Sequence, residues 1–175
     1  MDAQTLEPIR EELDEGLALP KRQPRFPDNI LWLLEAPDVV EVMSVRRYDP
    51  DPPEDEDEVE EIPTGPGYLH GYYIRGTARV PTAARRRALA QSLIQANHEG
   101  LGWAMCFDAD YAVRVSRGGR SADFLICFWC GNVCVVVPEG QAVKYPLGWS
   151  AARLLRRELR RGGVGWLWFW RRWLP

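Results

Sequence analysis

Long hydrophobic runs are absent from this 175-residue chain. Its most apolar stretches, NVCVVV and GWLWFW, are six residues each, whereas a helix that spans a bilayer needs about 18 to 20. The first residues, MDAQTLEPIREELDEG, are acidic, whereas a secretory signal begins basic and then becomes apolar. The sequence therefore predicts a cytoplasmic protein, for which contact with the membrane surface is the alternative.

Groups that catalyse reactions are also scarce. The chain has two histidines, His70 and His98, and it contains no Gly-x-Ser-x-Gly motif, no phosphate-binding glycine loop and no His-Glu-x-x-His motif. His98 ends an expected helix, where a cation stabilises the last carbonyls. His70 lies in an expected strand beside three tyrosines, where we favour a half-buried structural histidine over a polar binding patch. We therefore expect a protein that works by binding, since no motif in the sequence supports an enzymatic activity.

The chain has only four cysteines, too few for a secreted scaffold held together by disulfides, so reduced thiols are expected. Three of them lie in the run FLICFWCGNVC. The Cys127-x-x-Cys130-Gly pattern is typical of a zinc knuckle, for which Cys106, Cys134, His98 and His70 are the further candidate ligands. A redox pair is a second alternative, although reactive cysteines usually begin a helix and GNVCVVV continues as a strand.

The residues around these cysteines favour a structural role without a cofactor. Phe124 to Phe128 and Trp129 have the composition of a buried strand, and buried cysteine behaves as a small apolar side chain. A turn centred on Gly131 and Asn132 would place Trp129 opposite Cys134 and Cys127 opposite Val136. Zinc or thiol chemistry at Cys106, Cys127, Cys130 and Cys134 stays the alternative.

Charge is divided unevenly along the chain. Residues 1–66 contain 19 acidic and 6 basic side chains, whereas residues 67–175 contain 6 acidic and 16 basic ones, within a net charge of −3. Such a chain either folds its acidic half over its basic half or presents two faces of opposite sign to different partners. The acidic side chains that we expect to bind a partner are Glu54, Asp55, Glu56, Asp57, Glu58, Glu60 and Glu61.

The order of the predicted elements indicates an α+β fold. Helices are expected over residues 5–17, 28–36, 83–99 and 151–161, with Thr82 and Ser150 as the N-caps of the last two and Gly100 ending the third. Strands are expected over 39–48, 68–80, 102–107, 111–116, 121–129 and 133–137. Short turns between the later strands make them antiparallel neighbours. We predict a mainly antiparallel sheet with helices packed on one face. The chain divides into an N-terminal helical segment (1–36), a core domain (37–161) with an acidic loop (49–67), and a tail (162–175).

Three consecutive arginines, Arg85 to Arg87, open the helix expected at 83–99. Positive charge opposes the helix dipole at this end. We hypothesise that the acidic loop folds over these arginines and shields them, with a solvated charged face as the alternative.

The tail is rich in tryptophan, since four of the eight tryptophans lie between residues 166 and 173. Aromatic side chains of this kind anchor interfaces, so we rank docking to a protein partner or to the chain itself first. Contact with a membrane surface is second, and nucleic acid is third because the acidic half opposes it. The expected contact residues of the tail are Trp166, Trp170, Arg171, Arg172 and Trp173.

The run CFDADYAVRVSRGGRSADFLICFWCGNVCVVV resembles the signature region of a family of uncharacterised bacterial proteins. In that family a Cys-Phe pair precedes a short hairpin, and a strand of the type Asp-x-x-Ile-Cys-Phe-x-Cys follows. The matching residues are Cys106, Phe107, Asp123, Ile126, Cys127, Phe128 and Cys130. A Pro-x-His sequence follows the Cys-Phe pair in the family, whereas this chain has Ala109, Asp110 and Tyr111 near that place, which argues against a Cys/His metal site.

The resemblance supports the fold and implies no activity. Together with the charge division, it leads us to expect a small bacterial-type binding protein. A compact acidic chain that binds through its loop and its tail would suit an inhibitor or immunity-type protein that blocks a basic surface.

Overall fold

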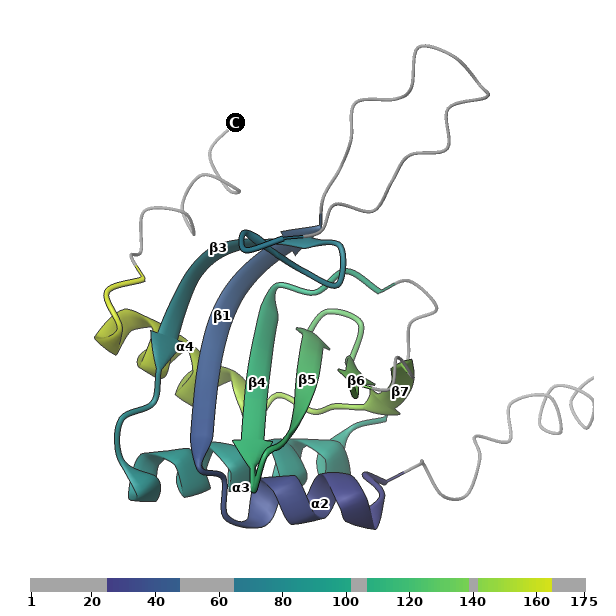
Figure 1. Ribbon diagram of the computed structural model, residues 1–175. Coiled ribbons are helices and arrows are strands. Elements are labelled where there is room, and N and C mark those ends of the chain that lie inside the picture. The colour runs from purple at the N-terminus through teal and green to yellow at the C-terminus, as the bar shows by residue number, and fades with distance from the viewer. Residues whose placement is uncertain (1–24, 48–64, 102–106, 139–141, 165–175) are drawn as a thin grey trace, which may run out of the picture.

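The computed structural model describes residues 25–47, 65–101, 107–138 and 142–164. Within these residues, seven strands form one antiparallel sheet and three helices pack against it (Figure 1). The strands are β1 (Val39–Arg47), β2 (Tyr68–Leu69), β3 (Tyr72–Arg79), β4 (Tyr111–Arg117), β5 (Arg120–Cys127), β6 (Asn132–Val136) and β7 (Ala142–Pro146), and the helices are α2 (Asp28–Glu35), α3 (Ala83–Glu99) and α4 (Ala152–Arg161). The predicted α+β class is confirmed.

The strands lie in the order β2-β3-β1-β4-β5-β6-β7, and every neighbouring pair is antiparallel. From β4 to β7 each strand lies beside the next one in the chain. Gly118 and Gly119 join β4 to β5 with φ angles of 53° and 78°, a conformation that glycine adopts without steric cost. The predicted strand at 102–107 lies almost wholly outside the described residues, and β7 was not predicted.

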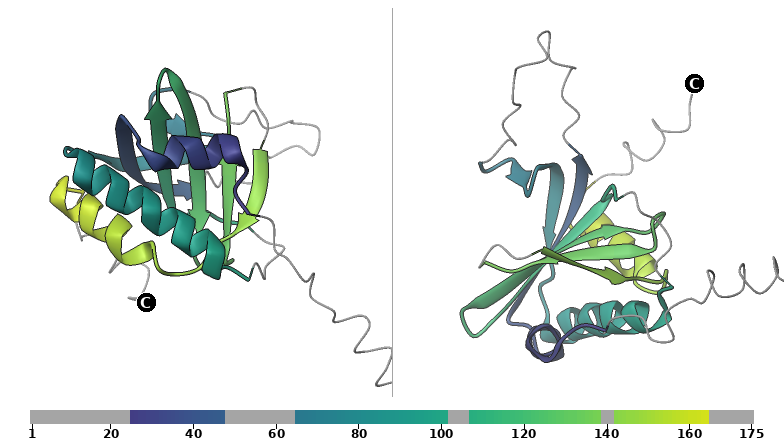
Figure 2. Two further views of the ribbon diagram at one scale, coloured as in Figure 1. Left: turned by 90° about the horizontal axis from the view of Figure 1, so that it is seen from below. Right: turned by 90° about the vertical axis from the view of Figure 1, so that its right-hand side faces the viewer.

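One face of the sheet packs against the helices (Figure 2). Alternate residues of each strand point to this face, so Val113, Phe124 and Val135 are buried beneath α2 and α3. Phe26, just before α2, contacts both Phe124 and Tyr145 edge to face, with ring centroids 5.7 and 5.2 Å apart. This layer is the main hydrophobic core.

The helix ends follow the expected signals in two of three cases. Thr82 caps α3 by accepting a hydrogen bond from the Arg85 N–H, and Gly100 ends that helix, as predicted. Helix α2 ends before Pro37, also as predicted. Helix α4 differs, since Ser150 is not its cap; the helix begins at Ala152, whose N–H binds the Trp149 carbonyl in the preceding turn.

The opposite face of the sheet is partly covered by the β2–β3 hairpin, where we had predicted a single bent strand. The chain reverses at His70 and Gly71, whose φ angles are 51° and 81°, and two consecutive positive values define a tight hairpin turn. The hairpin covers a second, smaller apolar cluster that includes Met43, Tyr72 and Leu125.

The β5–β6 turn is longer than predicted. Residues 128–131 form it, so Cys127 pairs with Asn132 and Leu125 pairs with Cys134. The predicted pairings of Trp129 with Cys134 and of Cys127 with Val136 are therefore wrong. The reason is local, because Gly131 has a φ angle of 64° and its N–H binds the Phe128 carbonyl, so the turn is centred two residues earlier than predicted.

Candidate functional site

All of the predicted contact residues lie outside the part of the chain that the structure describes. This applies to the acidic residues Glu54, Asp55, Glu56, Asp57, Glu58, Glu60 and Glu61, to the tail residues Trp166, Trp170, Arg171, Arg172 and Trp173, and to Cys106. The described residues bring three other groups together: the cysteine turn, a row of arginines on α4, and an ion cluster beneath the β2–β3 hairpin.

Cys127 and Cys130 form a disulfide across the β5–β6 turn, with their Cα atoms 5.3 Å apart. The expectation of reduced thiols is therefore wrong for this pair. Both residues are buried, and the Cys130 N–H lies 3.1 Å from the Cys127 sulfur. Cys134 is a free thiol on β6, where burial raises its pKa. Among the residues described, no group of three or more His, Cys, Asp or Glu side chains is placed to hold a metal.

The same turn pushes Trp129 outward. Its side chain is 77% exposed, which contradicts the prediction that it lies in a buried strand. Phe128 points inward instead and stacks on Trp149, with ring centroids 5.3 Å apart. Trp149 is itself 56% exposed. We call Trp129, Trp149 and the Phe128 ring that stacks on Trp149 the aromatic surface; the two loops that carry them are joined by the hydrogen bond from the Leu147 N–H to the Gly131 carbonyl.

Hydrogen bonds hold the two loops of the aromatic surface against each other and against α3. The Leu147 N–H binds the Gly131 carbonyl at 2.7 Å, and the Gly148 N–H binds the Ala96 carbonyl at 2.6 Å. The buried amide of Asn97 donates to the Pro146 carbonyl at 2.9 Å. Residues 146–148, directly before Trp149, are thus each held by a hydrogen bond.

Close backbone contact makes Gly100 a requirement of this loop. A Cβ atom at residue 100 would lie 2.3 Å from the Leu147 nitrogen, well inside the closest approach of nonbonded atoms. The glycine that ends α3 therefore also allows the loop before Trp149 to reach its position. The sequence signal for Gly100 was correct for the helix end but gave no indication of this second role.

Behind the aromatic surface, contacts run on to α4. The Phe128 ring meets Tyr111 edge to face at 5.7 Å, and the Tyr111 hydroxyl accepts a hydrogen bond from Arg156 Nε at 3.2 Å. Burial raises the pKa of Tyr111, which stays protonated at neutral pH. Arg156 is one of five arginines in the ten residues of α4.

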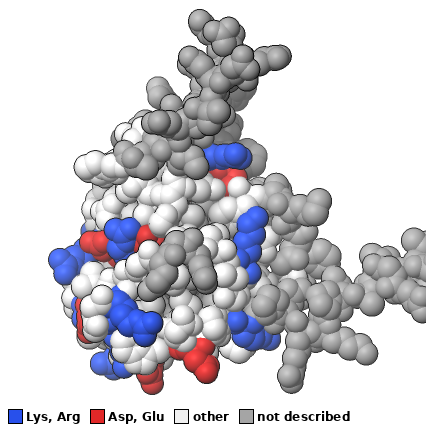
Figure 3. Space-filling model, turned by 45° about the vertical axis from the view of Figure 1, so that its right-hand side comes forward, with Lys and Arg blue, Asp and Glu red and all other residues white. Residues whose placement is uncertain are grey.

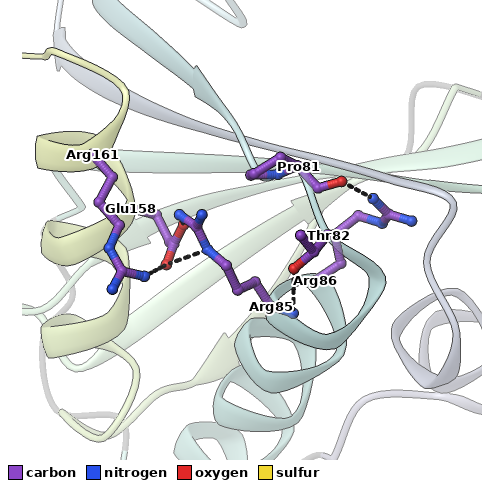
Figure 4. Close-up of polar contacts among 6 residues, drawn as sticks. All are labelled: Pro81, Thr82, Arg85, Arg86, Glu158 and Arg161. Carbon is purple, nitrogen blue, oxygen red and sulfur yellow. Dashed lines mark hydrogen bonds and ion pairs between the residues drawn. The ribbon is translucent and has the colours of Figure 1, made fainter.

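Helix α4 has a single acidic residue, Glu158, and it is buried. Its carboxylate pairs with Arg85 of α3 and with Arg161 one turn further along α4 (Figure 4). Arg86, beside Arg85, donates to the carbonyls of Pro37 and Pro81. The hypothesis that the acidic loop compensates these arginines is therefore not needed for Arg85, because Glu158 supplies the charge.

Positive charge dominates the described residues as a whole. They contain 17 Lys and Arg against 9 Asp and Glu, and on the side drawn in Figure 3 the basic side chains cover more of the described surface than the acidic ones. The negative net charge of the chain arises from residues that the structure does not describe. The described part of the chain consequently carries a net positive charge.

The ion cluster beneath the hairpin centres on Asp123 of β5, a residue that is 7% exposed. Arg114 of β4 binds both carboxylate oxygens, at 2.7 and 2.8 Å, and His70 Nε2 lies 2.8 Å from one of them. The hydrogen bonds with Asp123 raise the pKa of Arg114. The sequence singled out His70 and Asp123, but Arg114 was missed because it faces Asp123 only across the β4–β5 pair.

This cluster links the hairpin to the sheet. Asp123 accepts two hydrogen bonds from Arg114 and one from His70, so both of its oxygens have partners. The pairing with Arg114 and His70 is sufficient to account for the burial of the Asp123 carboxylate. We therefore assign His70 to the structural role that the sequence favoured.

No family model, no curated protein and no solved structure matches the chain. The resemblance to the Cys-Phe signature stays a prediction. None of the helices in the described residues is long and apolar enough to cross a membrane.

Proposed function

We propose that this chain is a binding module and that the aromatic surface is its contact with a protein partner. The observation that carries the proposal is the exposure of Trp129 and Trp149, 77% and 56%, on two loops that are bonded to each other. Transfer of a large aromatic side chain from water into a protein interface is favourable, so an exposed tryptophan can contribute to binding. A pair held in this position is typical of an interface in which a few aromatic residues provide most of the affinity.

The rigidity of the loops supports this function. Binding costs conformational entropy when loops and side chains must become ordered, and loops that are already fixed avoid much of that cost. The disulfide, the Asn97 amide and the stack of Phe128 on Trp149 each restrain the aromatic surface before any partner arrives.

Trp32 offers a useful contrast. It is also partly exposed, but the guanidinium of Arg117 lies 4.5 Å from its ring centroid. The guanidinium covers one face of the ring in a cation–π contact, so that face already has a partner within the chain. For this reason we do not place Trp32 in the contact surface.

The inhibitor or immunity-type role that the sequence suggests stays part of the proposal. In that role the acidic run of residues 54–61 meets a basic surface of the partner, and the tail of residues 162–175 adds aromatic anchors. The aromatic surface supplies a third contact element, formed by residues that the structure describes.

Site-specific photo-cross-linking tests the proposal. A photoreactive phenylalanine analogue replaces Trp129 in one strain of the source organism and Tyr73, a half-exposed ring of β3, in a matched strain. We expect a discrete adduct at position 129 that is absent at position 73, and we expect Trp149→Ala to remove it. Equal adducts at both positions, or none at position 129, would show that the aromatic surface contacts no partner.

A second candidate function is thiol or zinc chemistry at the cysteine turn. It is supported by the Cys-x-x-Cys spacing and by the Cys130 N–H, which points at the Cys127 sulfur and would stabilise a thiolate there after reduction. Native mass spectrometry of the chain purified with and without a dithiol reductant tests it. One zinc per reduced chain, lost in Cys127→Ser, supports the metal function. A metal-free reduced chain that reoxidises reversibly supports thiol chemistry. If neither outcome is observed, the disulfide is a structural crosslink only.

A further inference from the structure

Contacts through two buried rings, Phe128 and Tyr111, link the aromatic surface to α4. Trp149 stacks on Phe128, Phe128 meets Tyr111, and Tyr111 accepts a hydrogen bond from Arg156. The helix also begins three residues after Trp149. A ligand that covers Trp149 would therefore lie beside the first turn of α4.

The exposed charge of α4 is entirely positive among its described residues. Arg153, Arg157 and Arg160 are exposed, and their spacing of four and three residues places them along one side of the helix over about 10 Å. The one carboxylate of the helix, Glu158, is 4% exposed and is already paired with Arg85 and Arg161. It therefore does not neutralise the outer arginines.

We propose that the aromatic surface and the arginine row of α4 form one docking surface for an acidic segment of a protein partner. Apolar side chains of the segment contact Trp129 and Trp149, and its carboxylates contact Arg153, Arg157 and Arg160. This inference rests on the proposed function and names the chemistry of the partner. Guanidinium groups suit the occupant because they bind carboxylates in a planar, two-point geometry.

Charge also favours an acidic protein segment over nucleic acid. The affinity of proteins for a nucleic acid backbone depends on positive charge along an extended track, whereas this chain has a net charge of −3 and carries 16 of its 25 acidic residues outside the described core. A short acidic segment needs only the local surface, since screening limits charge effects to about 8 to 10 Å at physiological salt.

Fluorescence anisotropy with the full chain tests the docking surface. The probe is a fluorescein-labelled peptide composed of glutamate, leucine and serine, and its control replaces each glutamate by glutamine. We expect the glutamate peptide to bind at least about tenfold more tightly, and we expect that preference to fall several-fold when salt rises from low to physiological concentration.

Two charge-matched double variants locate the effect. Arg153→Glu/Arg157→Glu reverses two arginines of α4, and Arg46→Glu/Arg47→Glu reverses two exposed arginines at the end of β1. The first should abolish the preference for glutamate, and the second should preserve it, although both change the net charge equally. Equal loss in both variants would overturn the proposal, because the attraction would then come from overall charge. Circular dichroism confirms that each variant is folded.

Three further outcomes overturn the assignment of the partner. The first is failure of the glutamate peptide to bind more tightly than its glutamine control. The second is tighter binding of labelled oligothymidylate that is lost in Arg153→Glu/Arg157→Glu, which would assign the surface to nucleic acid. The third is binding that appears only after deletion of residues 49–62, which would assign it to the acidic run of the same chain.

The proposed function and this inference fail separately. If Trp149→Ala weakens the glutamate and glutamine peptides alike while the α4 double variant changes nothing, the aromatic surface binds protein without selecting acidic segments. If the α4 double variant abolishes binding and Trp149→Ala has no effect, the arginine row acts alone and the proposed function is wrong.

Discussion

The face of the sheet beneath the helices is packed chiefly with apolar side chains, whereas the face beneath the β2–β3 hairpin combines a small apolar cluster with a buried ion cluster. The helix face contains Phe124 at 0% exposure, and the hairpin face contains its neighbour Leu125 at 4% together with Asp123 at 7%. Consecutive residues of β5 thus point into two different environments.

The difference shows how each face specifies structure. Apolar burial is strong but has little direction, so the helix face depends on volume and periodicity. The hydrogen bonds of Asp123 with Arg114 and His70 depend on distance and angle. These bonds fix the position of the hairpin tip on the sheet. The few apolar residues of the hairpin alone would fix that position less precisely.

The largest expected effect concerns adjacent core residues of β5. Phe124→Ala should reduce the free energy of unfolding by about 4 kcal/mol, and Leu125→Ala by about 2 kcal/mol, because the first removes more volume from the larger core. Urea unfolding followed by tryptophan fluorescence measures both values. A cost for Leu125→Ala that equals or exceeds that for Phe124→Ala would show that the hairpin face is the main core.

The helix face was largely predictable from sequence, for physical reasons that particular residues illustrate. Thr82 and Gly100 mark the ends of α3 because caps act through neighbouring backbone groups. Alternation along β4 and β5 identifies Val113 and Phe124 as core because side chains of a strand alternate in direction. These signals are local, so they can be recognised in the sequence without knowledge of the tertiary structure.

The hairpin face and the candidate site were less predictable. The turn at His70 uses a positive φ angle, which is uncommon for residues other than glycine, and the pairing of Arg114 with Asp123 depends on the β4–β5 register. The exposure of Trp129 depends on a turn of four residues, whose length the cysteine spacing did not indicate. Each of these features is set by contacts between residues distant from one another or by backbone conformation.

The next prediction concerns the ion cluster. Asp123→Asn should destabilise the protein by about 2 kcal/mol, because Arg114 loses its paired carboxylate; the cost stays below that of a fully buried pair, since the side chains of Arg114 and His70 are 42% and 36% exposed. Chemical denaturation gives the change in stability, and hydrogen exchange of the β2–β3 amides should show increased local opening. Ser121→Ala, two residues earlier on β5, is the matched control and should leave both quantities nearly unchanged. Faster exchange throughout the sheet with no preference for the hairpin would contradict the assigned role.

A third prediction extends the comparison to the loop that carries Trp149. Gly100→Ala should cost about 1 to 3 kcal/mol, because the new methyl group meets the backbone of Leu147. The displacement should also change the fluorescence of the aromatic surface, since Phe128 and Trp149 would separate. Gly119→Ala is a useful comparison, because open space surrounds that position and only its φ angle of 78° causes strain. If Gly119→Ala altered the tryptophan emission as much as Gly100→Ala, the proposed contact would not control the loop.

The smallest effects should come from one buried phenol on each face. Tyr111 on the helix face accepts from Arg156 at 3.2 Å, and Tyr72 on the hairpin face accepts from the Ala109 N–H at 3.4 Å. Removing either hydroxyl with phenylalanine should cost about 1 kcal/mol or less at pH 7, with the larger cost at Tyr111 because its partner is charged. Thermal unfolding at neutral pH measures both.

The same two tyrosines predict how stability changes in alkali. Burial raises the pKa of each phenol above its ordinary value of 10.0. Below that value both phenols are protonated in the folded and unfolded states, so their contribution is fully present. As the pH rises past it, the unfolded chain ionises first, and stability falls until the folded phenols ionise as well. Tyr111→Phe and Tyr72→Phe should each make this alkaline loss shallower, and a wild-type stability that is flat between pH 9 and 11 (about one unit either side of the ordinary phenol pKa) would show that neither phenol is buried as described.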